Sequence, residues 1–334
     1  MLGPMAEPLP SVHPVRYSLV SPAVLLDAIR DPYGLSPGAS CQLLRRGLHD
    51  TYLIVSGDTR YIVRLYRSGV RSSEEVAYEL EALTHLVTRR VRVSSPIPDA
   101  EGQLIQLLAA PEGLRSLALF SYAPGVRLAW TETESKLAGA LLAEIHLTSG
   151  AFTPVHSRAS RDLECLVDRP LAEIGRFLKH RPQDWSFLTD VAARIRAGVT
   201  AVADALEWGF CHGDYGAKNI HLDAAGQVTA FDFDRCGPGW RAGDFALVMW
   251  AAVGRRRPEM WNAFVEGYRE RRPIANVDLD AVPLFHALAL LTAMGVLASN
   301  VDTWGTACVD NAALDGWLTS LRTWEAQHAP GWQP

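Results

Sequence analysis

The chain has 334 residues, of which 48% are hydrophobic and 21% are charged, and its formal net charge is −5 at pH 7. This length and composition exclude a disordered chain and fit one two-lobed unit or two modest domains. A net negative charge argues against a protein that lives on nucleic acid, and the arginine clusters at 89–90 and 255–257 are interpreted as solvated helix ends.

The sequence indicates neither a disulfide framework nor a membrane span. The five cysteines have no Cys-x-x-Cys spacing, so we also expect no zinc site. Cysteines without a disulfide pattern fit a location in the reducing cytoplasm. The run 281–298 is almost wholly apolar and about as long as a short membrane span. Because Pro283, His286 and Thr292 interrupt it and no basic anchors flank it, we predict a buried helix and no membrane contact.

The first part of the chain predicts a small sheet with two helices. Residues 21–35 are expected to form a helix, because Ser21 suits an N-cap, Pro22 the first turn and Gly34 the exit. A second helix is expected over 72–87. Segments rich in β-branched and aromatic residues lie between Gly- and Asp-containing turns, which predicts an antiparallel sheet. Its expected strands are 41–44, 51–55, 61–66, 104–108 and 117–122.

The rest of the chain is predicted to be mainly helical. The residues Ala-Pro-Gly at 123–125 are expected to end the last strand. After them, a helix of period 3.6 is expected over 131–150, with short helices within 156–187. Three acidic residues of that stretch either bind a cationic substrate or are ordinary helix charges: Asp162, Glu164 and Asp168. Later helices are expected at 260–268, 281–300 and 311–327. Five tryptophans are expected to be large buried anchors there: Trp250, Trp261, Trp304, Trp317 and Trp324.

One stretch carries side chains with the spacing that phosphoryl transfer needs. Residues 210–220, Phe-Cys-His-Gly-Asp-Tyr-Gly-Ala-Lys-Asn-Ile, are followed by Asp232 in Thr-Ala-Phe-Asp-Phe-Asp and by a Gly-Asp pair at Asp244. Transfer from ATP to a hydroxyl requires a carboxylate that accepts the hydroxyl proton and oxygen ligands for Mg²⁺. Asp214 is the candidate base, and Asn219 and Asp232 are candidate magnesium ligands.

Local sequence is expected to bring these side chains together. Strands at 220–222 and 228–231, joined by the turn Asp-Ala-Ala-Gly, predict a hairpin that folds Asp232 back beside Asn219. An Asp-x-x-x-x-Asn pair also arises by chance, and Asp residues in loops often cap turns. The preceding His-Gly, the hairpin and the later carboxylates favour catalysis, because they occur in the order that kinase chemistry requires.

Residues 210–220 resemble the catalytic loop of the aminoglycoside phosphotransferase family of kinase-like enzymes, in which His-Gly-Asp replaces the His-Arg-Asp of protein kinases. The similarity is greatest to the branch with type II homoserine kinases and a bacterial stress-response Ser/Thr kinase, and it extends over residues 20–327. It implies an α+β, two-lobed protein-kinase-like fold, with a small antiparallel-sheet N-lobe carrying one or two helices and a larger, mainly helical C-lobe. The expected boundaries are a tail at 1–18, the N-lobe at 19–122, the C-lobe at 123–327 and a tail at 328–334.

The resemblance also implies where the nucleotide's phosphates bind. The loop at Gly47 would cover the phosphates, and Arg64 would take the place of the usual phosphate-binding Lys. Arginine has the same positive charge as lysine and can bind a phosphate through two hydrogen bonds. Glu79, rather than Glu75, would pair with Arg64. The alternatives are a plain hairpin turn at Gly47 and solvated charges on the strand and the helix.

Two further nucleotide contacts follow from the resemblance. The backbone of residues 120–123, with Phe120 and Tyr122, would form the hinge that hydrogen-bonds adenine, although a strand end without a ligand has the same sequence. Lys218 either touches a phosphate or faces solvent.

Four polar residues complete the predicted site. His212 joins Asp214 in the catalytic set, more by orienting the loop than by transferring protons. Asp234 is a candidate ligand of a second Mg²⁺ or positions the acceptor, with turn capping as the alternative. Asp244 is expected to cap a helix and brace the catalytic loop, and His146 to be a packed histidine.

Together these features predict an enzyme, a kinase that uses ATP and Mg²⁺ to phosphorylate a hydroxyl of a small, amine-bearing molecule such as an aminoglycoside-like antibiotic, homoserine or an amino alcohol. Only eleven residues separate Asp232 from Asp244, too few for the activation segment of a protein kinase. Alternatives are a protein Ser/Thr kinase, a non-catalytic pseudokinase, which the replacement of Lys by Arg64 suggests, and a metal-dependent hydrolase. GTP is the alternative donor, and a monomer or homodimer is expected.

Overall fold

The structure, a computed structural model, describes residues 14–328, which form two compact units. The first unit holds the residues up to Ser73 together with Ile97–Ser121, and the second holds Glu74–Pro96 and the chain from Tyr122 onward. Strands dominate the first unit and helices the second, so the expected α+β fold with a sheet lobe and a helical lobe is confirmed. The domain boundaries stay a prediction, and the two tails lie largely outside the described residues.

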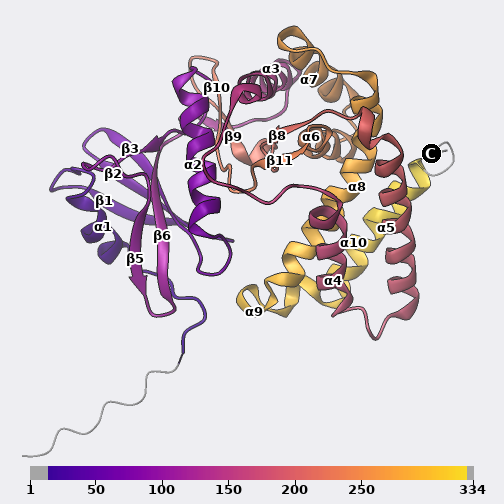
Figure 1. Ribbon diagram of the computed structural model, residues 1–334, viewed down its shortest axis with the longest axis horizontal. Coiled ribbons are helices and arrows are strands. Elements are labelled where there is room, and N and C mark those ends of the chain that lie inside the picture. The colour runs from indigo at the N-terminus through magenta and orange to yellow at the C-terminus, as the bar shows by residue number, and fades with distance from the viewer. Residues whose placement is uncertain (1–13, 329–334) are drawn as a thin grey trace, which may run out of the picture. The chain divides into compact units, whose positions relative to one another are not determined.

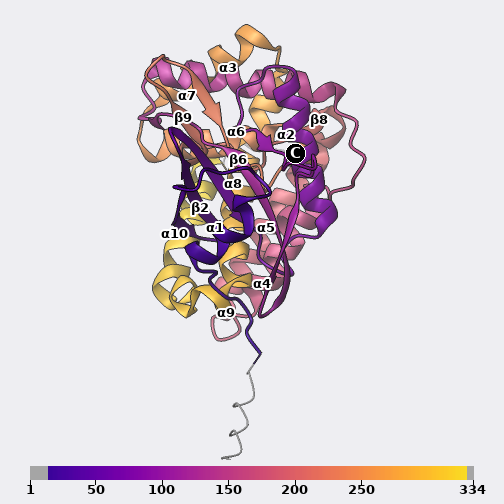
Figure 2. The ribbon, with the colours of Figure 1, turned by 90° about the vertical axis from the view of Figure 1, so that its left-hand side faces the viewer.

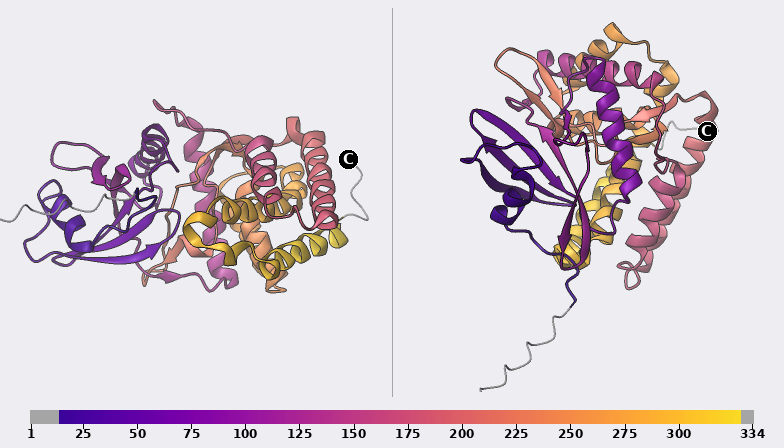
Figure 3. Two further views of the ribbon diagram at one scale, coloured as in Figure 1. Left: turned by 90° about the horizontal axis from the view of Figure 1, so that it is seen from below. Right: turned by 60° about the vertical axis from the view of Figure 1, so that its left-hand side comes forward.

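An antiparallel sheet forms the body of the first unit, in the order β1-β2-β3-β6, with β5 also paired to β6. The sheet is twisted, as Figure 3 shows. Each strand overlaps its predicted range, because runs of β-branched and aromatic residues between turn residues mark strands well. The strands are β1 (Ser40–Arg46), β2 (Asp50–Ser56), β3 (Thr59–Leu65), β5 (Gln106–Ala110) and β6 (Gly113–Ser121).

Helix α1 (Pro22–Arg30) packs on this sheet (Figure 1). Leu25 and Ile29 are buried in one cluster with side chains from β2, β3 and β6. The regular helix ends before residue 35 because Pro32 has no N–H to donate to the preceding turn. One further turn leads to Gly34, whose φ of +58° makes it the expected exit residue.

Helices form most of the second unit. The predicted helices at 72–87 and 131–150 are observed within two residues of their expected ends, and α2 groups with this second unit. Thr131 caps α3 in a capping box with Glu134. The helices are α2 (Ser73–Thr88), α3 (Glu132–Thr148), α4 (Arg169–Gly175), α5 (Pro182–Val202), α6 (Ala242–Gly254), α7 (Pro258–Arg271), α8 (Asn276–Ser299), α9 (Val301–Trp304) and α10 (Asn311–His328).

Short strands lie between the helices of the second unit. The strands β9 and β10 form the hairpin that the sequence predicted, and β7 pairs with β9. A separate antiparallel pair joins β8 to β11. These strands are β7 (Val126–Arg127), β8 (Trp208–Cys211), β9 (Ile220–Leu222), β10 (Val228–Ala230) and β11 (Gly237–Trp240), and the two-residue β4 (Pro96–Ile97) lies where the chain returns to the first unit.

Helix α8 is the core helix of the second unit. By length and composition it could cross a membrane, but 67% of its most apolar window is buried inside the protein. It packs against α4, α5, α6 and α10, as the prediction of a buried helix requires. Pro283 lies inside it, and the carbonyl oxygen of Pro283 accepts a hydrogen bond of 2.7 Å from the indole N–H of Trp324.

The prediction that five tryptophans are buried anchors is wrong for four of them. Only Trp324 is buried, at 9% exposure, whereas Trp250, Trp261, Trp304 and Trp317 are half-buried. Their indoles lie at the edges of the helix packing, where a large ring covers apolar surface without being enclosed. Among residues 14–328, the tryptophan that is fully buried is Trp130, just before α3.

Two glycines let α3 and α7 touch along their backbones (Figure 2). A Cβ atom at Gly139 would lie 1.9 Å from the carbonyl oxygen of Phe264. A Cβ atom at Gly267 would lie 2.0 Å from the carbonyl oxygen of Lys136. Because backbone atoms cannot move aside as a flexible side chain can, these positions require glycine.

We expect Gly267→Ala to destabilise the protein by about 1–3 kcal/mol or more, because the two helices must separate to admit the methyl group. Gly316→Ala is the matched control: Gly316 is an exposed residue of α10 with no atom within 4 Å of the added Cβ, and we expect this change to stabilise by up to about 1 kcal/mol. Urea unfolding of both variants measures the difference. Equal stabilities would contradict the close contact.

We expect His286 to make the protein less stable as the pH falls below 6.5. Burial, together with the charge of His328, lowers the pKa of His286 to about 4, and its Nε2 atom is buried without a hydrogen-bond partner in the described part of the chain. The unfolded chain therefore binds a proton that the folded protein does not, which costs about 2 kcal/mol between pH 6.5 and pH 5. His286→Leu should reduce this loss in unfolding curves at the two pH values. The control His180→Leu, at an exposed site, should leave the loss unchanged.

Candidate active site

The predicted catalytic loop connects β8 to β9 within the second unit. Gly213 has a φ of +79°, and a Cβ atom there would lie 2.2 Å from the carbonyl oxygen of Arg235. The second residue of His-Gly-Asp is therefore glycine both for its backbone conformation and for the close approach of the turn after β10. This contact brings the loop beside the segment that carries Asp232 and Asp234.

The buried carboxylate of Asp244 holds the start of this loop. It accepts the backbone N–H of His212 at 2.6 Å and that of Gly213 at 2.7 Å. His146 Nε2 lies 3.0 Å from the same carboxylate. Burial alone would raise the pKa of Asp244, but the hydrogen bonds that His146 and Gly213 donate to the carboxylate outweigh burial, so the pKa is lowered and the group is ionised. The sequence predicted this bracing; however, the N-cap of α6 is Arg241 and not Asp244.

His146 links the loop to the helix pair α3 and α7. Burial lowers the pKa of His146 despite the neighbouring Asp244, so the ring is neutral. Its Nε2–H then donates to Asp244, and Nδ1 accepts from the hydroxyl of Tyr268 at 3.0 Å. His146 is thus a packed histidine, as expected, but one that supports the loop. Sequence reasoning missed the contribution of Tyr268, and no sequence signal pointed to it.

His212 and Tyr215 hold the loop through backbone contacts. The ring of His212 is fully buried; its Nδ1 accepts the N–H of Asp214 at 3.2 Å, and its Nε2 lies 3.2 Å from the carbonyl oxygen of Phe231. Tyr215 donates its hydroxyl to the carbonyl oxygen of Ala138 in α3, at 2.7 Å. Both ring nitrogens of His212 are occupied, which favours the orienting role over proton transfer.

The structure places Asp214, Lys218 and Asn219 together. The side-chain nitrogen of Asn219 donates to the backbone oxygen of Asp214 at 2.9 Å and to its carboxylate at 3.2 Å. The Asn219 side-chain oxygen is thereby left as the atom able to bind a metal ion. Lys218 forms an ion pair of 2.8 Å with the Asp214 carboxylate and is half-exposed, so in this state it contacts the predicted base.

The hairpin β9–β10 carries the chain from Asn219 to Asp232. The N–H of Phe231 donates to the backbone oxygen of Asn219 at 2.9 Å, so the residue before Asp232 is tied to Asn219. Asp232 has a φ of +65°, in the left-handed region. Asp234 is buried. In residues 14–328 no group of three His, Cys, Asp or Glu side chains is arranged as a metal site, but the predicted set includes the amide of Asn219.

The predicted nucleotide-binding residues of the first unit lie on or beside its sheet. Gly47 follows β1, and its N–H donates to the carbonyl oxygen of His49 at 3.0 Å in a tight turn. Arg64 is 8% exposed, and its guanidinium carbon lies 5.2 Å from the ring centre of Phe120. The alternative of a solvated strand arginine at Arg64 is therefore wrong. Phosphate or adenine binding by these residues stays a prediction.

The predicted nucleotide-binding residues of the second unit are Glu79, Tyr122 and Lys218, the last of which is described above with Asp214. Glu79 is 1% exposed, whereas Glu75 is half-buried, so a solvated Glu79 is also wrong. Tyr122 is half-buried, and the next residue, Ala123, has its carbonyl oxygen 2.8 Å from Nδ1 of His221. The pairing of Glu79 with Arg64 stays a prediction.

The three acidic residues before α4 are engaged locally. Asp162 accepts the N–H of Cys165 at 3.0 Å, while Glu164 pairs with Arg169 at 3.1 Å. Asp168 pairs with Arg196. These contacts support the interpretation as ordinary helix charges.

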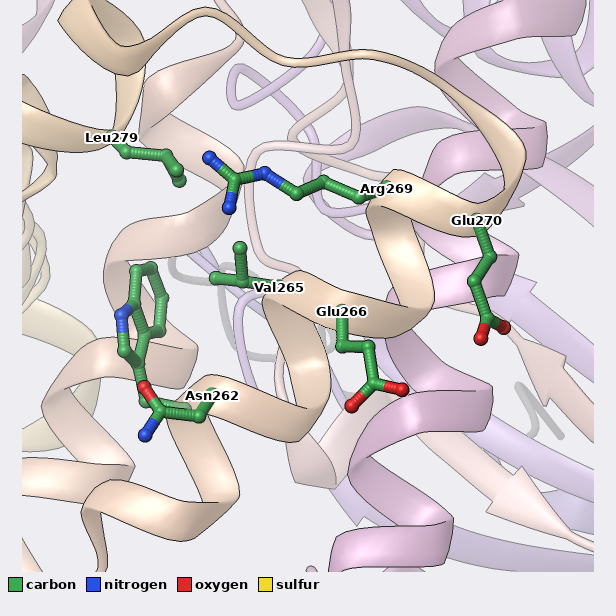
Figure 4. Close-up of a pocket in the computed structure, with 7 residues that line it drawn as sticks. Asn262, Val265, Glu266, Arg269, Glu270 and Leu279 are labelled. Carbon is green, nitrogen blue, oxygen red and sulfur yellow. The ribbon is translucent and has the colours of Figure 1, made fainter.

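A pocket of about 560 Å³ opens elsewhere on the second unit, along α7 (Figure 4). Trp261, Val265 and Leu279 form its apolar part. Its acidic residues, Glu266 and Glu270, form ion pairs of 2.6 and 2.7 Å with Lys136. None of the predicted site residues lines this pocket, so it is separate from the catalytic loop.

Comparison with known proteins agrees with this architecture. A Deinococcus radiodurans protein is 40% identical over 320 residues, which is 94% of this chain and 93% of that protein. The homoserine kinase of Caulobacter vibrioides is 26% identical over 300 residues, which is 84% of this chain and 87% of that one. The structure of amicoumacin kinase hAmiN in complex with AMP-PNP, Ca²⁺ and Ami has the same fold, with a TM-score of 0.73 at 20% identity, over 90% of this chain and 93% of that one.

The match that decides the family covers most of the chain. A model of the phosphotransferase enzyme family matches residues 40–277, which include the catalytic loop, the β9–β10 hairpin and Asp244. The chain is therefore a phosphotransferase and belongs to the phosphotransferase enzyme family, as the motif at residues 210–220 predicted.

Proposed function

We propose that this phosphotransferase moves the γ-phosphoryl group of ATP to a hydroxyl of a small, amine-bearing molecule. The observation that carries the proposal is the loop braced by Asp244, in which Asn219 donates to Asp214 and keeps its side-chain oxygen for a metal ion. The names of the relatives, homoserine kinase and amicoumacin kinase, support a small hydroxyl acceptor. The short connection from Asp232 to Asp244 favours a small acceptor over a protein acceptor, because it is too short for the activation segment of a protein kinase.

Asp214 accepts the proton of the acceptor hydroxyl as the oxygen attacks the γ-phosphorus. A new oxygen–phosphorus bond forms, the bond to the β–γ bridging oxygen breaks, and ADP leaves with that electron pair. Lys218 is paired with Asp214 in this structure. Because its side chain is long and half-exposed, it can turn toward a phosphate. His212 positions the loop, since both its ring nitrogens contact backbone groups.

Asn219 and Asp232 would hold Mg²⁺, with Asp234 as a further ligand. Carboxylate and amide oxygens are the ligands that Mg²⁺ prefers, so the residues fit the ion. The bound ion would neutralise charge on the phosphate oxygens.

The remaining nucleotide contacts would come from Gly47, Arg64 and Glu79 near the phosphates and from Phe120 and Tyr122 near adenine. An arginine can bind phosphate through two parallel hydrogen bonds, so Arg64 can replace a lysine there. All five cysteines are free thiols, which fits the proposed location in the cytoplasm. The proposed oligomeric state is a monomer or a homodimer.

We expect the protein to transfer labelled phosphate from ATP to at least one member of a panel of amino alcohols, hydroxy amino acids and aminoglycosides. Asp214→Asn should lower kcat by about 10²–10⁴-fold, because the proton acceptor is lost, while nucleotide binding persists. The control Asp204→Asn changes an exposed aspartate outside the loop and should keep full activity. Transfer to proteins alone, or none in wild type, would contradict the proposal.

We expect Asp244→Asn to lower kcat at least tenfold with a smaller change in the KM for ATP, because the side-chain NH₂ of Asn cannot accept the hydrogen bonds that the carboxylate accepts. The buried, unsatisfied donors should also reduce stability by about 1–3 kcal/mol. Asp278→Asn is the matched control: Asp278 is a buried carboxylate that accepts the N–H of Glu207 at 2.9 Å, away from the loop. This control should leave kcat unchanged, because the side-chain oxygen of Asn can still accept the one N–H. Equal kcat losses in the two variants would refute the bracing role.

A further inference from the structure

Two arginines lie on the segment between α3 and α4, against the turn that follows Asp232. Arg158 donates from Nη1 to the carbonyl oxygen of Glu75 at 3.1 Å and from Nη2 to the carbonyl oxygen of Asp234. Its aliphatic stem lies beside Gly237, at 3.7 Å from the position of an added Cβ. Arg158 is thus fixed next to one of the predicted metal ligands.

Arg161 occupies the adjacent position. Its Nη1 donates to the carbonyl oxygen of Arg235 at 3.4 Å, and its backbone N–H donates to Pro238 at 2.7 Å. Its guanidinium carbon would lie 3.1 Å from a Cβ atom at Gly213. This guanidinium therefore lies next to the glycine that directly precedes Asp214, the proposed base.

The two guanidinium groups retain hydrogen-bond donors and positive charge. Each has five N–H donors, of which Arg158 uses two and Arg161 one for the side-chain bonds described above. Neither forms an ion pair with a carboxylate of residues 14–328. The guanidinium nitrogens for which no bond is described above are Nε of Arg158 and Nε and Nη2 of Arg161. None of these three is among the buried atoms that lack a partner, so they are accessible to solvent.

The acidic residues on the same segment do not pair with these two arginines. Asp162, Glu164 and Asp168, on the same segment, are engaged with Cys165, Arg169 and Arg196, respectively. An anion would therefore find two guanidinium groups here that are held in place and are not paired with a carboxylate of the described residues. Such groups bind a carboxylate through charge-assisted hydrogen bonds of about 1.5–3 kcal/mol, which corresponds to a 10- to 150-fold change in affinity.

We propose that Arg158 and Arg161 form a subsite for a carboxylate of the acceptor, so that the substrate is a hydroxy acid, and in particular a hydroxy amino acid. This inference rests on the proposed function. The carboxylate binds the arginines, which directs the hydroxyl of the same molecule toward Asp214. The arginines are positioning residues for the acceptor and take no part in proton transfer.

The test compares two acceptors that differ only in the carboxylate: L-homoserine and 3-aminopropan-1-ol. We expect wild-type kcat/KM to be at least tenfold higher for L-homoserine. Equal use of the two, or a preference for 3-aminopropan-1-ol, would overturn the subsite. This comparison needs no variant, so it does not depend on how well a mutant folds.

Substitution then assigns the preference to the arginines. In Arg158→Gln/Arg161→Gln the ratio of kcat/KM for the two acceptors should fall at least tenfold, through a higher KM for L-homoserine. Arg176→Gln, which removes an exposed arginine paired with Glu173, should keep the wild-type ratio. A rise in the KM for ATP as large as that for L-homoserine would assign the arginines to the nucleotide's phosphates and overturn the proposal.

A binding measurement separates failure of the subsite from failure of the proposed function. Glycolate is titrated into the protein loaded with AMP-PNP and Mg²⁺ and followed by ligand-observed NMR, with ethylene glycol as the uncharged comparison. We expect glycolate to bind wild type at least tenfold more tightly than the double variant. Equal binding would overturn the subsite whatever the acceptor. Absence of phosphate transfer to any acceptor would instead defeat the proposed function, and the glycolate result would still decide the subsite.

Discussion

The site depends on one buried carboxylate that accepts three hydrogen bonds. Asp244 receives two successive backbone N–H groups of the catalytic loop and the ring N–H of His146. Removing a carboxylate from water is expensive, and these donors replace its lost solvation, so the charge persists inside the protein. Because the two amides belong to His212 and Gly213, the direction in which the chain leaves toward Asp214 is set by this one group.

The support continues into the helices behind the loop. The glycine contacts between α3 and α7 bring the two helices close enough for His146 to reach Tyr268, and Tyr215 of the loop reaches Ala138 of α3. Packing thus sets the position of a histidine, the histidine orients a carboxylate, and the carboxylate holds the loop. A rigid scaffold of this kind keeps reacting groups within the small tolerance that phosphoryl transfer allows.

Local features of the sequence predicted much of this architecture. The turn Asp-Ala-Ala-Gly predicted the hairpin, and the alternation of β-rich runs with turns predicted the sheet, since both depend on neighbouring residues. Bracing of the loop by Asp244 was also predicted. The contributions of His146 and Tyr215 could not be predicted, because their partners, Asp244 and Ala138, lie 98 and 77 residues away in the sequence. The prediction of buried tryptophans failed for a related reason. Size and apolarity favour burial, but tertiary packing decides which ring is enclosed, and the ring of Trp130 is enclosed here.

The backbone at Asp232 restricts which amino acids evolution can try at that position. With φ at +65°, a Cβ atom crowds the following carbonyl oxygen, so glycine is favoured there. Asparagine and aspartate come next, because their short polar side chains can hydrogen-bond to the local main chain. Among those three tolerated choices only aspartate bears a full negative charge. Glutamate has the same carboxylate one methylene farther from the main chain, but the left-handed backbone conformation is less favourable for glutamate than for aspartate.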